Sequence, residues 1–332
     1  MRLTSACVLA ACCSSIALGW SAHGHRVVTL LAIEHFEDTA PAWLLTPEMR
    51  DRVAYQSNEC DRWRATHAPA ISHENKPDHF LDVEHLWLMG MTLEEMPRLR
   101  RVYIGDVALA RAGDSSATPT TYDPAKDPDR AYEYPGFLPH EIMEHYDKLC
   151  SSFQTARIIE SIDDPSRAAQ LEQARSNAVY HMGVLSHFVG DGAQPLHLTE
   201  HFNGWVGDNP SGYTTERSFH ADIDGGAIDR HAIGLAGVRS LGCSTPEVDS
   251  ADPWADVLAY LGESFRLVEP LYAMEKSGAL EDDAGKAFLE ERLAAGGAML
   301  GALYSAAWDA SEPSEDQVNS FQKHNDHRPD GD

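Results

Sequence analysis

The sequence predicts a mainly α-helical fold in a single domain, and three observations support this. Apolar residues recur at helical spacing in several long segments, and no segment shows the alternation typical of a β-strand. Of 332 residues, 43% are hydrophobic, which is enough to bury one sizeable core. Stretches rich in glycine, proline and polar residues separate the helical segments. We therefore expect one helical domain with long loops, at residues 20–310.

Residues 1–19 have the features of a secretory signal peptide. Arg2 is their only charged residue, an apolar run follows, and Ala17-Leu18-Gly19 matches a signal-peptidase cleavage site. Cleavage there would make Trp20 the N-terminus of a secreted or periplasmic protein. The alternative is a lipoprotein signal ending at Cys12, but the apolar stretch before Cys12 is short.

Within the domain, apolar periodicity predicts the helices in order. We expect them at 25–36, 43–64, 93–111, 139–162, 167–191, 253–276 and 283–308. Pro139 stands in the first turn of the fourth helix, where proline is tolerated, and a glycine and a proline end the fifth. Loops are expected at 66–77, 113–136 and 198–219, and the polar residues 311–332 are expected to form a disordered tail.

The charge of the chain narrows the classes of function. Lys and Arg number 26 against 52 Asp and Glu, a formal net charge of −26. This balance argues against passive electrostatic capture of nucleic acid and against docking on an anionic membrane. It does not exclude an anionic substrate, because bound divalent cations can dominate the local charge of a site.

The cysteines indicate a limited role for disulfides. Three of the 6 lie within residues 1–19, which leaves Cys60, Cys150 and Cys243 in the mature chain, with no CxxC motif. In an oxidising compartment one disulfide could form, and the sequence does not choose the pair. Cysteine ligation of a metal is not expected.

The segment 187–197, H-F-V-G-D-G-A-Q-P-L-H, predicts a metal site at a helix end. His187 and Asp191 are four residues apart, so on a helix they project from one face. The helix then stops, and the chain turns to bring His197 close to the same point. Imidazole and carboxylate groups that converge in this way fit a metal ion, most simply zinc. The alternative interpretation is a helix cap with two ordinary polar histidines.

Other residues of ligand type stand at the edges of the expected loops. His220 and Asp224 repeat the four-residue spacing, in H-A-D-I-D. The full set of such residues outside the segment 187–197 is His25, Asp61, His79, His220 and Asp224. A closed zinc site takes about four ligands, so this set predicts a multinuclear site in which a carboxylate such as Asp191 bridges two ions.

Several residues compete with these ligands or imitate a motif. Asp51 and Glu59 lie near Asp61, and Asp222 lies near Asp224, which the four-residue spacing favours. The segment 140–145, H-E-I-M-E-H, differs from the zinc-protease motif because its histidines are five residues apart. We expect that segment to be a solvated helix surface.

The order of the motifs resembles the superfamily of trinuclear zinc phosphodiesterases, which contains fungal-type single-strand nucleases (S-one/P-one type) and bacterial zinc-dependent phospholipases C. The matching motifs are W-x-x-x-G-H (20–25), D-x-x-R (61–64), H-F-x-D (79–82), H-F-x-G-D-x-x-Q-P-L-H (187–197) and H-x-x-x-D (220–224). The long motif is highly specific, and the match at Asp61 is weak. The resemblance implies a helical fold of the phospholipase C / single-strand nuclease type.

The resemblance also implies three zinc ions. The first would be held by Asp61, His79, His187 and Asp191. The second would be held by His197, His220 and Asp224. The third would use the free amine and carbonyl of Trp20, with His25 and the bridging Asp191, and so would require cleavage before Trp20.

The function implied is hydrolysis of phosphodiester bonds. Asp61 would orient or deprotonate the attacking water, Arg64 would stabilise the pentacoordinate phosphorus, and Phe80 and Asp82 would stack on and hydrogen-bond a base. The W-x-x-x-G-H motif and Arg64 favour an endonuclease and 3'-nucleotidase that acts on single-stranded DNA and RNA to give 5'-nucleotides. The alternatives are a phospholipase C acting on phospholipid headgroups and a non-catalytic zinc-binding exported protein. We expect a monomer without a stable protein partner.

Overall fold

The computed structural model describes residues 20–66 and 68–325 of the chain, and over these residues the protein is mainly helical. The only β-structure in the described part is one isolated antiparallel bridge, between Leu81 and Gly136. The predicted helical class is therefore confirmed. The signal peptide predicted at residues 1–19, with its cleavage site and the alternative at Cys12, lies outside the described residues.

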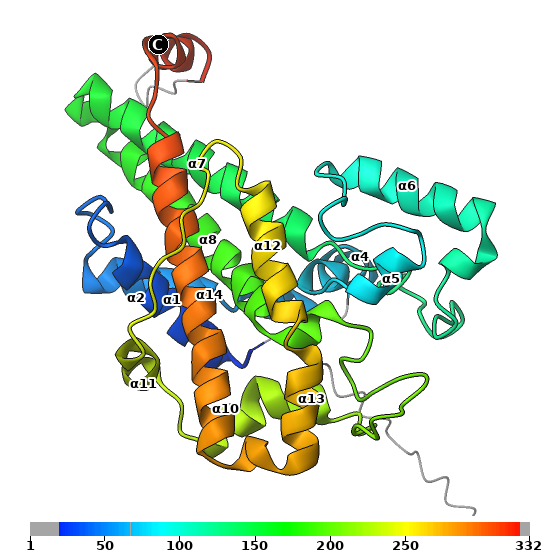
Figure 1. Cartoon of the computed structure of the whole chain (residues 1–332). Helices are drawn as coiled ribbons and strands as arrows, with labels where there is room; N and C mark the ends of the chain where they lie inside the picture. The colour runs from blue at the N-terminus through cyan, green and yellow to red at the C-terminus, as the bar shows by residue number, and fades with distance from the viewer. Residues whose placement is uncertain (1–19, 67, 326–332) are drawn as a thin grey trace, which may run out of the picture.

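The helices follow one another in the order shown in Figure 1. The α-helices are α1 (Ala22–Phe36), α2 (Pro47–Gln56), α3 (Glu59–Arg64), α4 (Pro69–Asn75), α5 (Val83–Trp87), α6 (Arg100–Gly113), α7 (Leu138–Ile162), α8 (Ala168–Ala193), α9 (Phe219–Ala221), α10 (Ala227–Arg230), α11 (Leu235–Ser240), α12 (Trp254–Phe265), α13 (Val268–Ser277), α14 (Asp283–Ala310) and α15 (Glu315–Ser320). Short 3-10 turns are η1 (Lys76–His79), η2 (Ser115–Ala117), η3 (Pro165–Arg167), η4 (Pro195–Leu198) and η6 (Ala279–Glu281), and π-helical turns are η5 (Asp222–Gly226) and η7 (Phe321–Asn325).

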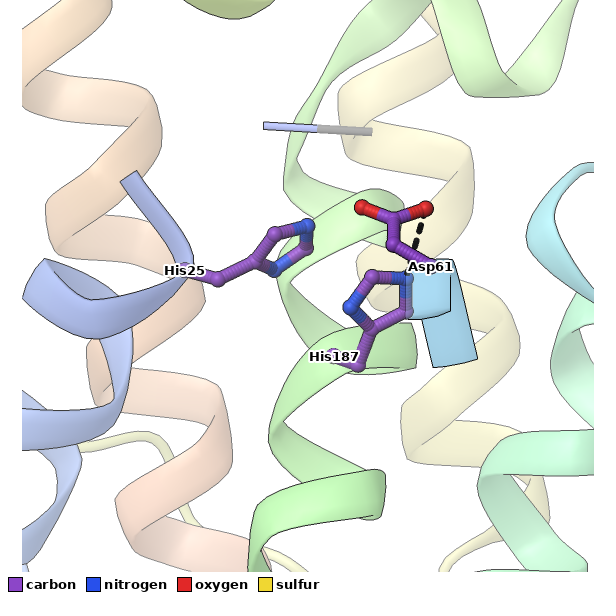
Figure 2. Close-up of side chains that lie close together, drawn as sticks. All are labelled: His25, Asp61 and His187. Carbon is purple, nitrogen blue, oxygen red and sulfur yellow. Dashed lines mark ion pairs between the residues drawn. The ribbon is translucent and has the colours of Figure 1, made fainter. Parts of the chain in front are cut away.

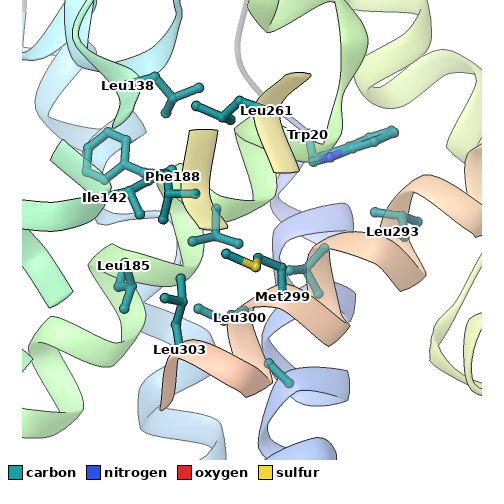
Figure 3. Close-up of a cluster of buried hydrophobic side chains, with 14 of the residues drawn as sticks. Trp20, Leu138, Ile142, Leu185, Phe188, Leu261, Leu293, Met299, Leu300 and Leu303 are labelled. Atoms are coloured by element: carbon teal, nitrogen blue, oxygen red, sulfur yellow. The ribbon is translucent and has the colours of Figure 1, made fainter. Parts of the chain in front are cut away.

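Helix α8 lies at the centre of the bundle and packs against α1, α2, α7, α12 and α14. Leu185 and Phe188 of α8 meet Ile142 of α7 and Leu300 and Leu303 of α14 in the apolar cluster that Figure 3 shows. Each such side chain stabilises the fold by about 1.5–3 kcal/mol through burial. The C-terminal part of α8 is buried on all sides from Met182 onward. Polar residues on these last turns therefore face protein, not solvent.

Most of the long helices agree with the expected ones, but four segments differ. The segment 93–111 is helical only from Arg100 onward, in α6. The segment 66–77, expected to be a loop, contains α4, because Pro69 occupies its first turn and does not interrupt it. The segment 43–64 forms two helices, α2 and α3. The segment 253–276, expected to be one helix, is broken at Arg266 and Leu267 into α12 and α13.

The expectation of a disordered tail at 311–332 is wrong for residues 315–325, which form α15 and η7. Ser314 and Gln317 make a reciprocal capping box, which satisfies backbone donors at the start of α15. Phe321 packs against a small buried cluster of Ala156, Ile159 and Ala174. A local cap and one apolar anchor thus order this segment.

The cysteines of the described chain are free thiols, so the disulfide considered from the sequence is not formed. Cys60 is buried, Cys150 is half-buried and Cys243 is exposed.

Helix α6 stands at the periphery of the bundle, as Figure 1 shows, and leads into residues 113–136, here called the insertion loop. The loop contains the 3-10 turn η2 and otherwise irregular structure, as expected. Over the described residues, none of the helices has both the length and the apolar character that crossing a bilayer requires.

Candidate metal centre

The predicted His and Asp ligands converge on the buried end of α8 from separate parts of the chain. Helix α8 supplies His187 and Asp191, and the turn that follows it, η4, supplies His197. The others come from α1, α3, η1, α9 and η5 as His25, Asp61, His79, His220 and Asp224. Three groups of these residues place one donor atom each close enough to share a metal ion: His25, Asp61 and His187; His79, His187 and Asp191; His197, His220 and Asp224.

In the central group, donor atoms of three residues surround one point. Nδ1 of His79 lies 2.9 Å from Oδ2 of Asp191 and 3.1 Å from Nε2 of His187. Nε2 of His187 lies 3.5 Å from the same carboxylate oxygen. Donors that share a tetrahedral zinc at about 2.0–2.1 Å stand about 3.3 Å apart. The spacing of this group therefore fits a bound ion of that size.

A second group lies at η5. Nε2 of His220 is 3.3 Å from Oδ2 of Asp224, again the spacing of two donors on one ion. The rings of His197 and His220 approach edge to face, with centroids 4.8 Å apart. Nε2 of His197 also lies 3.8 Å from Oδ1 of Asp191, which connects this group to the central one.

His25 faces both Asp191 and Asp61. Its Nε2 lies 3.4 Å from Oδ1 of Asp191, and its ring stacks on that of His187 with centroids 4.0 Å apart. Figure 2 shows the rings of His25 and His187 and the carboxylate of Asp61 pointing toward one another; Asp61 Oδ1 is 4.0 Å from Nε2 of His187. The resemblance groups His25 with Trp20 and Asp191, and the geometry allows either grouping.

Trp20 is buried beside this part of the centre. Its indole Nε1 donates a hydrogen bond to the carbonyl oxygen of Gly190 at 2.8 Å. Gly190 permits the close approach, because a Cβ there would lie 2.9 Å from Nδ1 of His25 and 3.8 Å from Cδ1 of Trp20. The structure therefore places Trp20 and His25 against the same turn of α8. Ligation through the amine of Trp20 stays a prediction, since the preceding residues lie outside the described chain.

Several ligands are oriented by hydrogen bonds from their other polar atoms. Nδ1 of His187 donates to the carbonyl of Ser57 at 2.7 Å, and Nδ1 of His197 donates to that of His79 at 2.6 Å. Nε2 of Gln194 donates to Oδ1 of Asp224 at 2.8 Å. Bonds of this kind fix the tautomer of an imidazole and aim its free nitrogen at a metal.

Several candidate donor atoms at the centre are buried and have no hydrogen-bond partner among the described residues. They include His25 Nε2, Asp191 Oδ1, His197 Nε2, His220 Nε2 and Asp224 Oδ2. Leaving one such atom unsatisfied costs about 1–3 kcal/mol, so a cluster of them is unfavourable unless a ligand completes it. Metal ions bound by these nitrogens and carboxylate oxygens would satisfy the whole set. The residues therefore fit a metal centre.

Burial also sets the protonation of the ligands. Desolvation lowers the pKa of His197 to about 3, and it lowers the pKa values of His25 and His220 well below 6.5. The imidazoles are thus neutral at pH 7, as metal ligands must be. Desolvation raises the pKa values of Asp191 and Asp224 well above 3.8. A cation between them would offset this penalty and favour the carboxylates.

A pocket opens beside the centre. It is lined by His79, His197 and His220 together with Arg64, Lys76, Phe80, Tyr132, Leu196 and Phe202. The guanidinium of Arg64 is largely buried, and its Nη1 lies 3.3 Å from Oδ1 of Asp61. The pocket thus combines three candidate ligands, two cations and three aromatic rings.

Of the two residues predicted to bind a base, Phe80 lines this pocket and Asp82 does not. Oδ2 of Asp82 lies 3.5 Å from Nδ1 of His85, whose Nε2 lies 3.2 Å from Glu200. Burial raises the pKa of Asp82 to about 7, and His85 partly offsets that rise. The structure therefore gives Asp82 a partner within the protein.

The segment 140–145 is not the solvated surface that the sequence suggested. His140 and His145 are both buried, His140 beside Tyr103 and Trp254 and His145 beside residues of α8. His140 stacks on Tyr103 and donates from Nε2 to the carbonyl of Pro97 at 2.9 Å. Nε2 of His145 lies 3.3 Å from Glu141. Neither histidine belongs to the metal groups of the described chain.

Sequence reasoning did not single out Lys76, Tyr132 or Phe202 as pocket residues, or Ser57 as a partner of His187. Lys76 and Tyr132 belong to segments expected to be loops, which carry no periodic signal. Gln194, by contrast, stands within the motif 187–197, and that position was a signal for its role beside Asp224.

Scans of protein-family models, of curated proteins and of solved structures found no match to this chain. The donor atoms themselves define the chemistry open to the site. They are imidazole nitrogens and carboxylate oxygens, the set that suits zinc and related divalent metals, and no thiol of the described chain belongs to them.

Proposed function

We propose that this protein is a zinc-dependent phosphodiesterase that cleaves single-stranded DNA and RNA to 5'-nucleotides. The observation that carries the proposal is the position of Asp191, whose two carboxylate oxygens face different groups of buried donors. A carboxylate in that position suits a multinuclear centre. Such centres clamp the attacking and leaving oxygens of a phosphate ester.

The resemblance assigns the residues that would hold the ions, and the groups described above support it in part. Asp61, His79, His187 and Asp191 would hold one ion, of which His79, His187 and Asp191 form one group, and His197, His220 and Asp224 would hold a second. His25 with Asp191 and the amine of Trp20 would hold a third, once residues 1–19 have been removed. When bound, zinc supplies Lewis acidity that polarises a phosphate and acidifies water.

The chain's own residues supply positioning and charge. The carboxylate of Asp61, partly exposed next to Arg64, would orient the attacking water and accept its proton. Arg64 would hold a non-bridging phosphate oxygen through its guanidinium, whose planar fork suits phosphate. Because Arg64 is largely buried, its interaction with phosphate would be screened little by solvent.

The residues that line the pocket favour a nucleic acid over a choline headgroup as the substrate. Phe80, Tyr132 and Phe202 offer ring faces on which bases stack, worth about 1–3 kcal/mol per base. Arg64 and Lys76 in the same pocket would attract phosphate and repel a quaternary ammonium. Single strands expose their bases for such stacking, whereas duplexes do not.

Phospholipase C activity is the second candidate, and one observation favours it. Large apolar side chains are exposed on α5, α6 and next to them: Trp87 is 56% exposed, Leu99 66% and Leu109 72%. Exposed apolar side chains of this size are suited to contact with a lipid surface.

The test is a parallel assay of the mature protein on single-stranded DNA, RNA and phosphatidylcholine vesicles, with and without a chelator, alongside zinc analysis. We expect about three zinc ions per chain, chelator-sensitive cleavage of nucleic acid, and its loss in Asp61→Asn. Asp51→Asn, at an exposed aspartate paired with Arg26, is the matched control. Lipid turnover without nucleic-acid cleavage would select phospholipase C. Zinc binding without any turnover would select the non-catalytic protein, and less than one zinc per chain would reject the metal centre.

A further inference from the structure

The insertion loop forms a wall of the pocket and is fastened to the segment that carries His79. Its last residue, Gly136, pairs with Leu81 in the isolated bridge. Gly136 adopts φ +115, and a Cβ there would lie 2.1 Å from the carbonyl oxygen of Phe80. Only glycine allows the two backbones to approach so closely. The contact of Gly136 with Phe80 and Leu81, next to His79, therefore fixes the position of the loop at the pocket.

The loop presents an aromatic ring at the pocket. The buried carboxylate of Asp127 accepts hydrogen bonds from the amides of Ala131 and Tyr132, each at 2.9 Å, which shapes the turn before the ring. Tyr132 then stacks on Phe80, with centroids 5.6 Å apart and planes 21° from parallel. Tyr132 remains 46% exposed. One side of its ring is thus covered by Phe80 while much of it stays open to solvent.

The loop also positions a lysine. Nζ of Lys76 lies 3.4 Å from Oδ2 of Asp129, and both side chains are about three-quarters buried, at 28% and 27% exposed. The carbonyl of the same Asp129 accepts a hydrogen bond from Nδ1 of His73 at 2.7 Å. An ammonium group has three donors, so this single partner leaves capacity for another anion. Asp129 holds the side chain of Lys76 in place and leaves hydrogen-bond donors of its ammonium group available.

Two cations in one pocket are unexpected in a chain of net charge −26. Arg64 belongs to α3, three residues after the candidate ligand Asp61, whereas Lys76 belongs to η1 and contacts the insertion loop. One phosphate at the metal centre would use the first cation. The second cation has no role in that chemistry.

We propose that Lys76 binds a phosphate adjacent to the scissile one, with the intervening nucleoside against Tyr132. This inference rests on the proposed function and gives it a substrate class: chains with consecutive phosphodiesters, in preference to a lone phosphodiester. Asp129 is a positioning residue for Lys76. The loop therefore contributes to recognition of the chain on one side of the cleaved bond.

The experiment compares the dinucleotide TpT, which has only the scissile phosphate, with pTpTpT, in which the first phosphodiester lies between the 5'-terminal phosphate and a second phosphodiester. We expect the native protein to prefer pTpTpT in kcat/KM, and Lys76→Gln to lower that preference about tenfold, the effect of losing one charge-assisted hydrogen bond. Lys76→Arg should retain most of it. Asp129→Asn should reduce it in the same direction by a smaller factor.

Lys126→Gln is the matched control, because it removes the same charge at an exposed lysine of the adjacent insertion loop, which pairs with Asp123. The control should keep the native preference, and circular dichroism and melting temperatures should agree among the variants. Binding of fluorescently labelled pTpTpT to chelator-treated protein provides a second readout, which Lys76→Gln should weaken about tenfold.

Equal losses on TpT and pTpTpT, or an equal effect of Lys126→Gln, would overturn the inference. If the native protein cleaves neither substrate, the proposed function fails, and the binding measurement still decides whether Lys76 holds phosphate. Cleavage of both substrates with unchanged preference in Lys76→Gln would instead leave the function intact and reject the role of Lys76.

Discussion

Nε2 of His25 lies 3.4 Å from Oδ1 of Asp191, although the two residues are on different helices and 166 positions apart in the chain. The other carboxylate oxygen of Asp191 faces a different imidazole, since Oδ2 is 2.9 Å from His79. Both residues are fully buried. A single carboxylate therefore connects α1, η1 and α8 at the point where the candidate ligands meet, and substitutions there should affect several groups at once.

Asp191→Asn should lower the zinc content of the protein by half or more, because an amide is a weaker ligand than a carboxylate and carries no charge. Elemental analysis of the purified variant measures this directly. The control is Asp222→Asn. Asp222 lies two residues before Asp224, and its half-exposed carboxylate pairs with Arg230. An Asp191→Asn protein with native zinc content would contradict the bridging role.

Arg64→Gln should reduce kcat on single-stranded DNA by roughly 10²–10³ with a smaller change in KM, as expected for loss of a charged donor that acts in the transition state. Arg62→Gln is the matched control, because Arg62 is more exposed and pairs with Glu59, not Asp61. Steady-state kinetics of both variants give the answer. Similar losses in the two would show that charge near α3 matters in general, and that Arg64 has no special role.

Acid should destabilise the metal-free protein. Burial lowers the pKa of His197 from 6.5 to about 3, so below about pH 6.5 the unfolded chain binds a proton that the folded chain does not. The stability from this group is complete above pH 6.5 and falls by about 1.4 kcal/mol per pH unit below it. Five ligand imidazoles have lowered pKa values, whereas the raised pKa values of Asp191 and Asp224 act in the opposite direction. The imidazoles should dominate between pH 4 and 6.5.

Urea unfolding in chelator at pH 7 and pH 5 tests this dependence. His197→Gln should make it shallower, while His324→Gln, at an exposed histidine of η7, should leave it unchanged. Stability that stays constant or rises toward pH 5 would contradict the assignment of buried neutral imidazoles.

Gly136→Ala should displace the insertion loop and lower the free energy of unfolding by about 1–3 kcal/mol, because of the strained φ and the overlap with Phe80. It should also raise KM for oligonucleotides. Gly113→Ala, at the other end of the loop, meets nothing within 4 Å and should change neither quantity. Thermal melts and limited proteolysis report on the loop, and native proteolytic resistance in Gly136→Ala would argue against the anchor.

The long helices could be predicted because each has apolar positions that recur over several turns, as in α8 and α14. The ligands could be predicted because His187 and Asp191, like His220 and Asp224, stand one helical turn apart. Helix α4 was missed because the two prolines of the segment 66–77 indicate a loop, although Pro69 stands where a helix begins. The burial of His140 depends on packing between distant segments, and no local pattern records it. The same holds for Lys76 and Tyr132, whose roles depend on where the insertion loop returns.

The insertion loop is also closed upon itself. Arg111, at the end of α6, donates a hydrogen bond to the carbonyl of Glu133 and lies over the ring of Tyr134. A surface segment whose ends are joined in this way is a self-contained unit, of the kind that can be replaced without altering the scaffold beneath it. Transplanting a different loop between Arg111 and Gly136 would change what surrounds the pocket and leave all eight His and Asp donors in place. If the proposed activity holds, such a change would alter selection of the substrate separately from the reaction, and the two could be engineered independently.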